Sequence, residues 1–75
     1  MVNNSKVFIK TEYITLGAFL KFAGITQTGG EAKRFLDFHL VKVNDQPIAS
    51  RGYKIFRGDS VTIETDKYLI LEDYE

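Results

Sequence analysis

The spacing of the apolar residues changes close to His39. From Leu16 to that point apolar residues recur every three or four positions, as on the buried side of an α-helix, and beyond it they alternate, as in a strand with one buried face. Helices are therefore expected before His39 and most of a sheet after it. With 75 residues the chain can form one domain with a modest core. We predict an α+β fold that comprises residues 1–75 as a single domain.

Two capping signals predict two helices in close succession. Thr15 is suited to cap the first helix, and Gly24 is suited to end it because glycine enters the left-handed region without strain. Thr28 and Glu31 form the capping box of the second helix. Only residues 25–27 separate the helices, so they must pack as an angled pair. The apolar positions are Leu16, Phe19, Leu20 and Ala23 in the first helix and Ala32, Phe35 and Leu36 in the second.

Short strands are predicted on both sides of the helical pair. Residues 6–10 form an opening strand. Residues 40–43 and 46–48 form a hairpin around Asn44-Asp45, a pair that tolerates left-handed backbone, and Pro47 belongs on an edge strand or at a strand start. The sequence thus predicts two packed helices followed by a small antiparallel sheet, with an added N-terminal strand. The remaining extended segments are expected at 53–56, 61–63 and 67–71.

Charge is distributed unevenly although the chain is neutral overall. Residues 15–57 carry seven Lys and Arg against three Asp and Glu, a net charge of +4. Residues 58–75 carry one Lys against six acids, a net charge of −5, and end in an acidic tail at about 72–75. A basic middle beside an acidic end favours an anionic partner, although a mixed solvated surface would give the same count.

Several functional classes have no support in the residues. The chain has no cysteine, which excludes disulfides and thiolate metal sites, and His39 is its one histidine. We expect no metal, no cofactor and no enzymatic activity. No apolar run approaches the ~20 residues that span a bilayer, and no signal peptide is recognisable near the start. A cytoplasmic monomer that binds neither membrane nor small-molecule substrate is the expectation.

An ordered set of motifs resembles the S4 RNA-binding domain. The set includes Thr28-Gly29-Gly30-Glu31-Ala32-Lys33-Arg34 at the start of the second helix, Val41-Lys42-Val43-Asn44 in the hairpin and Gly58-Asp59-Ser60-Val61 in a later turn. It covers about residues 14–63 and is most similar to the free-standing YaaA-like S4 domain proteins. The resemblance implies the S4-like (alpha-L) fold. It also implies docking of the second helix and the hairpin on structured RNA, usually ribosomal, with a role in ribosome assembly.

Three positions depart from the S4 pattern. Thr28-Gly29 stands where the family usually has Ser-Arg, so one cation that would hold a phosphate is missing. The turn Asn44-Asp45 replaces the common Asn-Gly, which puts an acid at the tip of the hairpin. His39 lies near a position that is usually glycine.

The expected RNA-binding residues come from the second helix, the hairpin and the segment after it. Residues 28–30 could seat a phosphate on free backbone N–H groups, or could form only a flexible turn with a capping box. Lys33 and Arg34 could hold phosphates, or could form an ordinary solvated face. The full set is Thr28, Gly29, Gly30, Lys33, Arg34, Lys42, Asn44, Arg51, Lys54 and Arg57.

The aromatic residues give a weaker signal for base stacking. Phe8, Phe19, Phe35 and Phe56 occupy apolar-face positions and are assigned to the core. Phe22 and Phe38 have no clear place, and Tyr53, between two cations, is the one stacking candidate. The rival interpretation is a protein–protein interaction adaptor with an S4-like fold and no RNA affinity, which the neutral net charge would suit.

Overall fold

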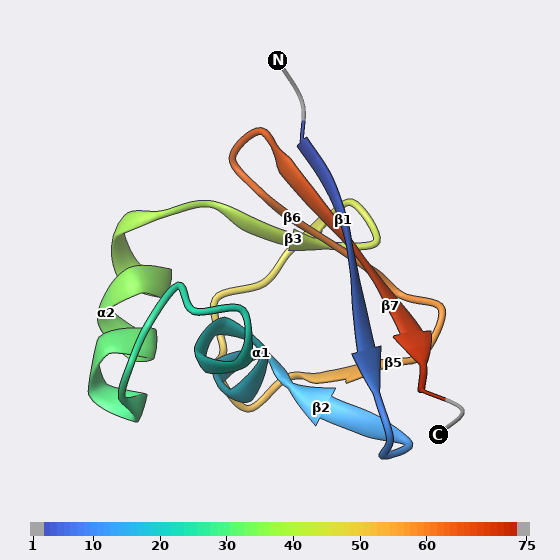
Figure 1. Ribbon diagram of the computed structural model, residues 1–75. Coiled ribbons are helices and arrows are strands. Elements are labelled where there is room, and N and C mark those ends of the chain that lie inside the picture. The colour runs from blue at the N-terminus through green and yellow to red at the C-terminus, as the bar shows by residue number, and fades with distance from the viewer. Residues whose placement is uncertain (1–2, 74–75) are drawn as a thin grey trace.

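The computed structural model describes residues 3–73, which form helices and strands in the α+β arrangement that the sequence predicts (Figure 1). The elements are β1 (Asn3–Ile9), β2 (Tyr13–Thr15), α1 (Leu16–Phe22), α2 (Gly29–Phe38), β3 (Val41–Val43), β4 (Gln46–Pro47), β5 (Lys54–Phe56), β6 (Ser60–Ile63) and β7 (Asp66–Glu72).

Five strands form one sheet in the order β1-β7-β6-β3-β4. Strands β7, β6, β3 and β4 pair antiparallel, and β1 is added parallel to β7. The predicted helical pair, antiparallel sheet and added N-terminal strand are thus confirmed. Pro47 lies in β4 at the edge of the sheet, where its missing N–H costs no ladder hydrogen bond. Strand β5 pairs instead with β2, a short strand that the sequence pattern did not predict.

Both helices begin where their capping residues predict. The Thr15 hydroxyl accepts a hydrogen bond from the Ala18 N–H at 3.2 Å, and Gly24 has φ of 78° just after α1. The Thr28 hydroxyl accepts from the Glu31 N–H at 3.1 Å. Glu31 Oε1 accepts from the Gln27 N–H at 2.7 Å, one residue earlier than the donor of a standard capping box. The side chain of Glu31 therefore fixes the link between the helices as well as the start of α2.

The core lies between the helical pair and one face of the sheet (Figure 1). Phe19 of α1 is fully buried and meets Tyr68 of β7 edge to face, with ring centroids 5.3 Å apart. Burial of a large apolar side chain stabilises the fold by roughly 1.5–3 kcal/mol. The buried apolar residues are Val7, Ile9, Leu16, Phe19, Leu20, Ala32, Leu36, Val41, Val43, Ile55, Val61, Ile63 and Ile70.

Two aromatic residues expected in the core, Phe8 and Phe56, are exposed. Phe8 lies between buried Val7 and Ile9, so the alternation of strand β1 points its ring to the outer face. Phe56 likewise follows buried Ile55. On the small sheet that β2 and β5 form, its ring packs against the Tyr13 ring, with centroids 5.6 Å apart. The prediction was wrong at both positions because it weighed the size of the side chain above the period of two.

The acidic end of the chain joins the domain through strand β7. Glu72 is the last residue of that strand, and its Oε1 lies 3.0 Å from Nη1 of Arg57. The Asp73 N–H donates to the Ile9 carbonyl oxygen at 2.9 Å. The first two residues of the expected acidic tail at 72–75 are therefore held against the domain. Residues 74 and 75 lie outside the described residues.

Candidate nucleic-acid interface

Helix α2 turns its cations away from the core. Ala32 and Leu36 are buried, and these two positions define the inner side of the helix. Lys33 and Arg34 are exposed on the other side, as predicted from the spacing. Within residues 3–73 neither of them forms an ion pair, since the pairs found there join Arg57 to Glu72 and His39 to Glu64. Both side chains are therefore available to an external anion.

Arg51 ties the loop before β5 to the starts of both helices. Its Nη1 donates to the Gly29 carbonyl oxygen at 2.9 Å, and its own carbonyl oxygen accepts from the Gly17 N–H at 2.8 Å. A Cβ on Gly17 would lie 3.2 Å from the Arg51 Cβ and 3.3 Å from the Arg51 carbonyl oxygen. Glycine at position 17 thus permits this close approach, a requirement that the sequence analysis did not recognise.

A surface hollow of about 430 Å³ lies where the loop and the two helices meet. Its polar lining includes Thr15, Lys21, Thr28 and Arg51, together with the backbone of Gly29 and Gly52. Lys33 follows Gly29 by one helical turn and so lies on the same side of α2. Cations, hydroxyls and a helix N-terminus in one place suit a phosphate group.

Lys21 is the residue of this hollow that the sequence analysis missed. Its charge belongs to the basic middle of the sequence, but the apolar spacing of α1 by itself indicates only a core helix. Its position in the last turn of α1, two residues after buried Phe19, already placed it off the buried side. We call Lys21, Lys33, Arg34 and Arg51 the basic surface.

The hairpin residues of the expected site have different roles. Asn44 and Asp45 adopt left-handed backbone, with φ of 51° and 70°, as predicted for this turn. Asn44 Nδ2 donates to Asp59 Oδ1 at 3.0 Å, and Asn44 Oδ1 accepts from the Ser60 N–H at 3.0 Å. The amide of Asn44 thus joins two turns that are 15 residues apart. Lys42 is half-buried and alternates with buried Val41 and Val43, so it lies on the outer face of the sheet.

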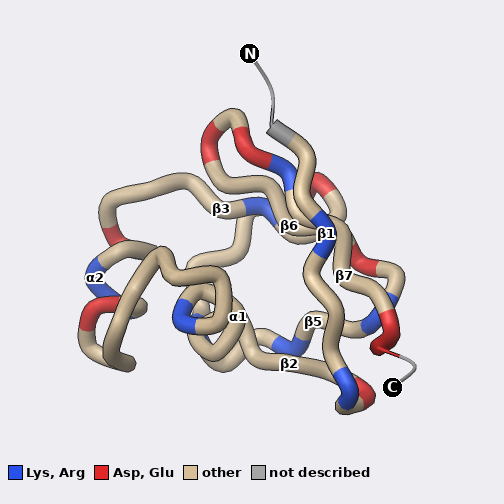
Figure 2. The backbone as a smooth tube through the Cα atoms, in the orientation of Figure 1, with Lys and Arg blue, Asp and Glu red and all other residues tan. Residues whose placement is uncertain are grey.

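The remaining two cations lie apart from α2. Lys54 Nζ lies 4.9 Å from the centroid of the Tyr13 ring on the small sheet. Arg57 follows β5 and pairs with Glu72 at the end of β7, on the opposite side of the molecule from α2 (Figure 1). Blue segments on α1, α2, β3 and β5 in Figure 2 show how widely the cations are spread. The structure brings Thr28, Gly29 and Arg51 together at the hollow, with Lys33 one helical turn further along α2. Arg34 lines a different pocket of α2, and Lys54 and Arg57 lie apart from both.

Two other features of the described part bear on function. No group of three potential metal-ligating side chains is found within residues 3–73. No helix formed by these residues has the length and apolar character needed to cross a membrane.

The structure thus has two capped helices and, after them, a hairpin. The Asn44–Asp59 hydrogen bond joins the hairpin turn to the later turn at Asp59. A family model described as the S4 domain matches residues 7–71, and the chain belongs to that family. The match extends beyond residues 14–63, which carry the motifs, and includes most of strands β1 and β7. The resemblance seen in the sequence is thereby confirmed.

A curated relative comes from Bacillus subtilis (strain 168). It carries the name probable ribosome maturation protein RlbA and is 55% identical to this chain over 58 residues. The aligned residues make up 77% of this chain and 82% of the relative.

Proposed function

We propose that this protein is a non-catalytic, cytoplasmic factor that binds structured ribosomal RNA during ribosome assembly. Membership of the S4 domain family and the name of the relative, a probable ribosome maturation protein, support this role. The observation that carries the proposal is the basic surface. Lys33 and Arg34 have no ion pair within residues 3–73, and Lys33 lies one helical turn from the hollow that holds Lys21 and Arg51.

Such a surface suits recognition of RNA by shape. Structured RNA is bound largely through its phosphates and 2′-hydroxyl groups, which require correctly placed cations rather than contacts to base edges. Arg34 and Arg51 can hold phosphate oxygens with two N–H groups each, and lysines act as point charges. The neutral net charge does not oppose binding, because the attraction between a fixed cation and a phosphate is mainly local at physiological salt.

Reversal of charge on α2 tests the proposal. The double variant Lys33→Glu/Arg34→Glu should lose affinity for ribosomal RNA while its circular dichroism spectrum stays unchanged, since both side chains are exposed. Lys6→Glu/Lys10→Glu is the matched control, because it makes the same change in net charge at exposed positions on and just after β1. Equal losses in both variants, or no loss in the first, would overturn the assignment of this surface.

A second candidate is the protein adaptor. Phe22 and Leu40 are 62% and 56% exposed, and apolar residues of this size at a surface are typical of protein contacts. Capture of a protein partner that resists high salt, with no RNA retained, would favour the adaptor. Salt-sensitive retention of ribosomal RNA would favour the RNA-binding function.

A further inference from the structure

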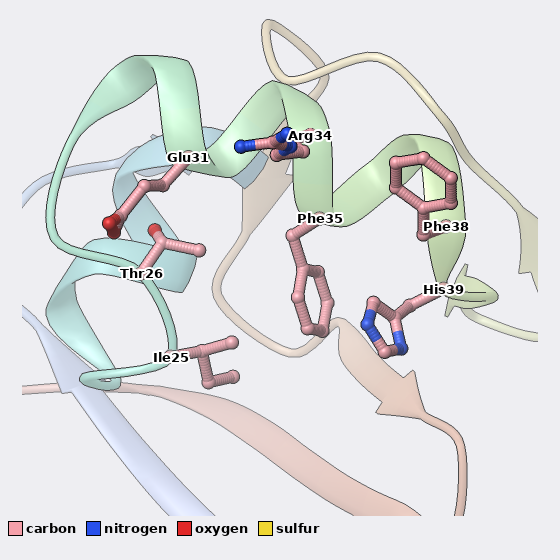
Figure 3. Close-up of a pocket in the computed structure, with 7 residues that line it drawn as sticks. All are labelled: Ile25, Thr26, Glu31, Arg34, Phe35, Phe38 and His39. Carbon is pink, nitrogen blue, oxygen red and sulfur yellow. The ribbon is translucent and has the colours of Figure 1, made fainter.

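A second concave site lies on the other side of α2 from the hollow at Arg51. It is an open pocket of about 540 Å³ between the second half of α2 and the link at Ile25 and Thr26 (Figure 3). Arg34 stands at its rim, so the pocket adjoins the basic surface without being part of it. We call it the α2 pocket.

Aromatic rings form one part of the α2 pocket. Phe35 and His39 stack with centroids 4.2 Å apart and an angle of 17° between their planes. His39 Nδ1 also lies 3.7 Å from a carboxylate oxygen of Glu64. Phe38 also lines the pocket and is 77% exposed, and in Figure 3 its ring lies apart from the stacked rings of Phe35 and His39.

Polar groups form another part of the pocket. Thr26 is only 5% exposed, and its hydroxyl has no hydrogen-bond partner among the described residues. Figure 3 shows this hydroxyl on the same side of the pocket as the carboxylate of Glu31. Glu31 uses Oε1 to accept from the Gln27 N–H, so its second oxygen can accept from a ligand. A buried hydroxyl without a partner costs stability, and a ligand that supplies a partner would recover that loss.

We propose that the α2 pocket binds one unstacked base of the RNA. Unstacked bases in the single-stranded parts of RNA stack on the flat faces of aromatic rings and guanidinium groups. The edge of a base carries both donors and acceptors, which match the Glu31 carboxylate and the Thr26 hydroxyl. An apolar protein side chain would leave the Thr26 hydroxyl without a partner and would give the second Glu31 oxygen no donor. This inference rests on the proposed RNA-binding function and adds an unpaired nucleotide beside the phosphate contacts of the basic surface.

Short oligonucleotides of equal charge separate base contacts from phosphate contacts. The probes are an adenine ribohexamer and an abasic hexamer with the same backbone, both labelled at the 5′ end for fluorescence anisotropy with the full-length chain. The adenine hexamer should bind at least tenfold more tightly than the abasic one. Phe38→Ala should weaken binding of the adenine hexamer by about 5- to 150-fold, the range for loss of one base–aromatic stack. The abasic hexamer should bind both proteins alike.

Matched variants show whether the effect belongs to the pocket. Phe22→Ala removes an equally large ring that is 62% exposed and does not line the pocket, so it should bind both hexamers like the unmodified protein. Thr26→Val should weaken binding of the adenine hexamer while leaving the free protein at least as stable. Because the chain has no tryptophan, Phe38→Trp gives a single tryptophan, which can be excited separately from the four tyrosines and whose fluorescence should be quenched by the adenine hexamer.

Equal affinity for the two hexamers, or an unchanged affinity in Phe38→Ala, would overturn the base-binding pocket. An equal loss in Phe22→Ala would overturn it as well. Ribosomal RNA distinguishes this failure from failure of the proposed function. If the unmodified protein binds ribosomal RNA through Lys33 and Arg34 but does not discriminate between the hexamers, only the pocket is excluded. If it does not bind ribosomal RNA at all, the proposed function fails and the pocket proposal fails with it.

Discussion

Removal of the Asn44 side chain should destabilise the fold by a predictable amount. Its amide makes two hydrogen bonds of 3.0 Å, to Asp59 Oδ1 and from the Ser60 N–H. At about 0.5–1.5 kcal/mol each, they contribute roughly 1–3 kcal/mol. Asn44→Gly removes these bonds while keeping a residue that accepts φ of 51°. Asn44→Ala removes the same bonds and adds the strain of a left-handed Cβ, roughly 1 kcal/mol more.

Thermal unfolding followed by circular dichroism measures this loss. For a domain of this size 1 kcal/mol corresponds to about 4–8 °C in Tm, so Asn44→Gly should lower Tm by roughly 4–24 °C. Asn44→Ala should unfold at a lower temperature still. Asp45→Gly is the control, because Asp45 also has positive φ, 70°, but its side chain makes no hydrogen bond within residues 3–73. A Tm for Asn44→Gly equal to that of the unmodified protein would refute the structural role of this residue.

Two further changes test the start of each helix. Thr28→Ala should lower the free energy of unfolding by about 1 kcal/mol because it removes the cap of α2, and Thr28→Ser should keep most of this stability. Urea unfolding measures both variants, and an unchanged stability of Thr28→Ala would contradict the cap. Gly17→Ala should lower stability and displace Arg51, because the new Cβ would meet Arg51 atoms at 3.2–3.3 Å. Gly30→Ala, where the nearest atom is 3.9 Å away, should instead stabilise by up to about 1 kcal/mol, so a gain in both variants would argue against the close approach at position 17.

Local signals predicted the elements well because their causes are local. The hydroxyls of Thr15 and Thr28 cap the helices, and the Asn44-Asp45 pair forms its turn, through contacts within a few residues. The switch of apolar spacing near His39 marks the end of α2, where His39 is the C-cap. Each of these features could be recognised without knowledge of the tertiary structure.

Long-range features could not be recognised in the same way. The pairing of β2 with β5 and the insertion of β7 between β1 and β6 depend on how distant strands meet. The spread of the cations has the same origin, since Arg57 follows β5 to the side of the molecule that holds the end of β7. Arg51, close to Arg57 in sequence, folds back onto Gly29 instead. Neighbours in a basic stretch of sequence therefore lie on different surfaces.

The aromatic residues show a third limit. Phe38 follows the apolar stripe of α2 but lies 77% exposed, and Phe8 lies 49% exposed between two buried neighbours. Composition identifies such residues as apolar, but their exposure depends on whether another element covers them. The α2 pocket could therefore not be found from the sequence, where Phe38 had no clear place and His39 stood alone.

The salt dependence of RNA binding tests the central claim most directly. Each phosphate contact that is removed should reduce the slope of log K against log salt by about 1. Lys33→Ala/Arg34→Ala should therefore bind ribosomal RNA with a slope smaller by about 2 than that of the unmodified protein, and Lys6→Ala/Lys10→Ala should leave the slope unchanged. The same slope for all three proteins would contradict phosphate binding by α2.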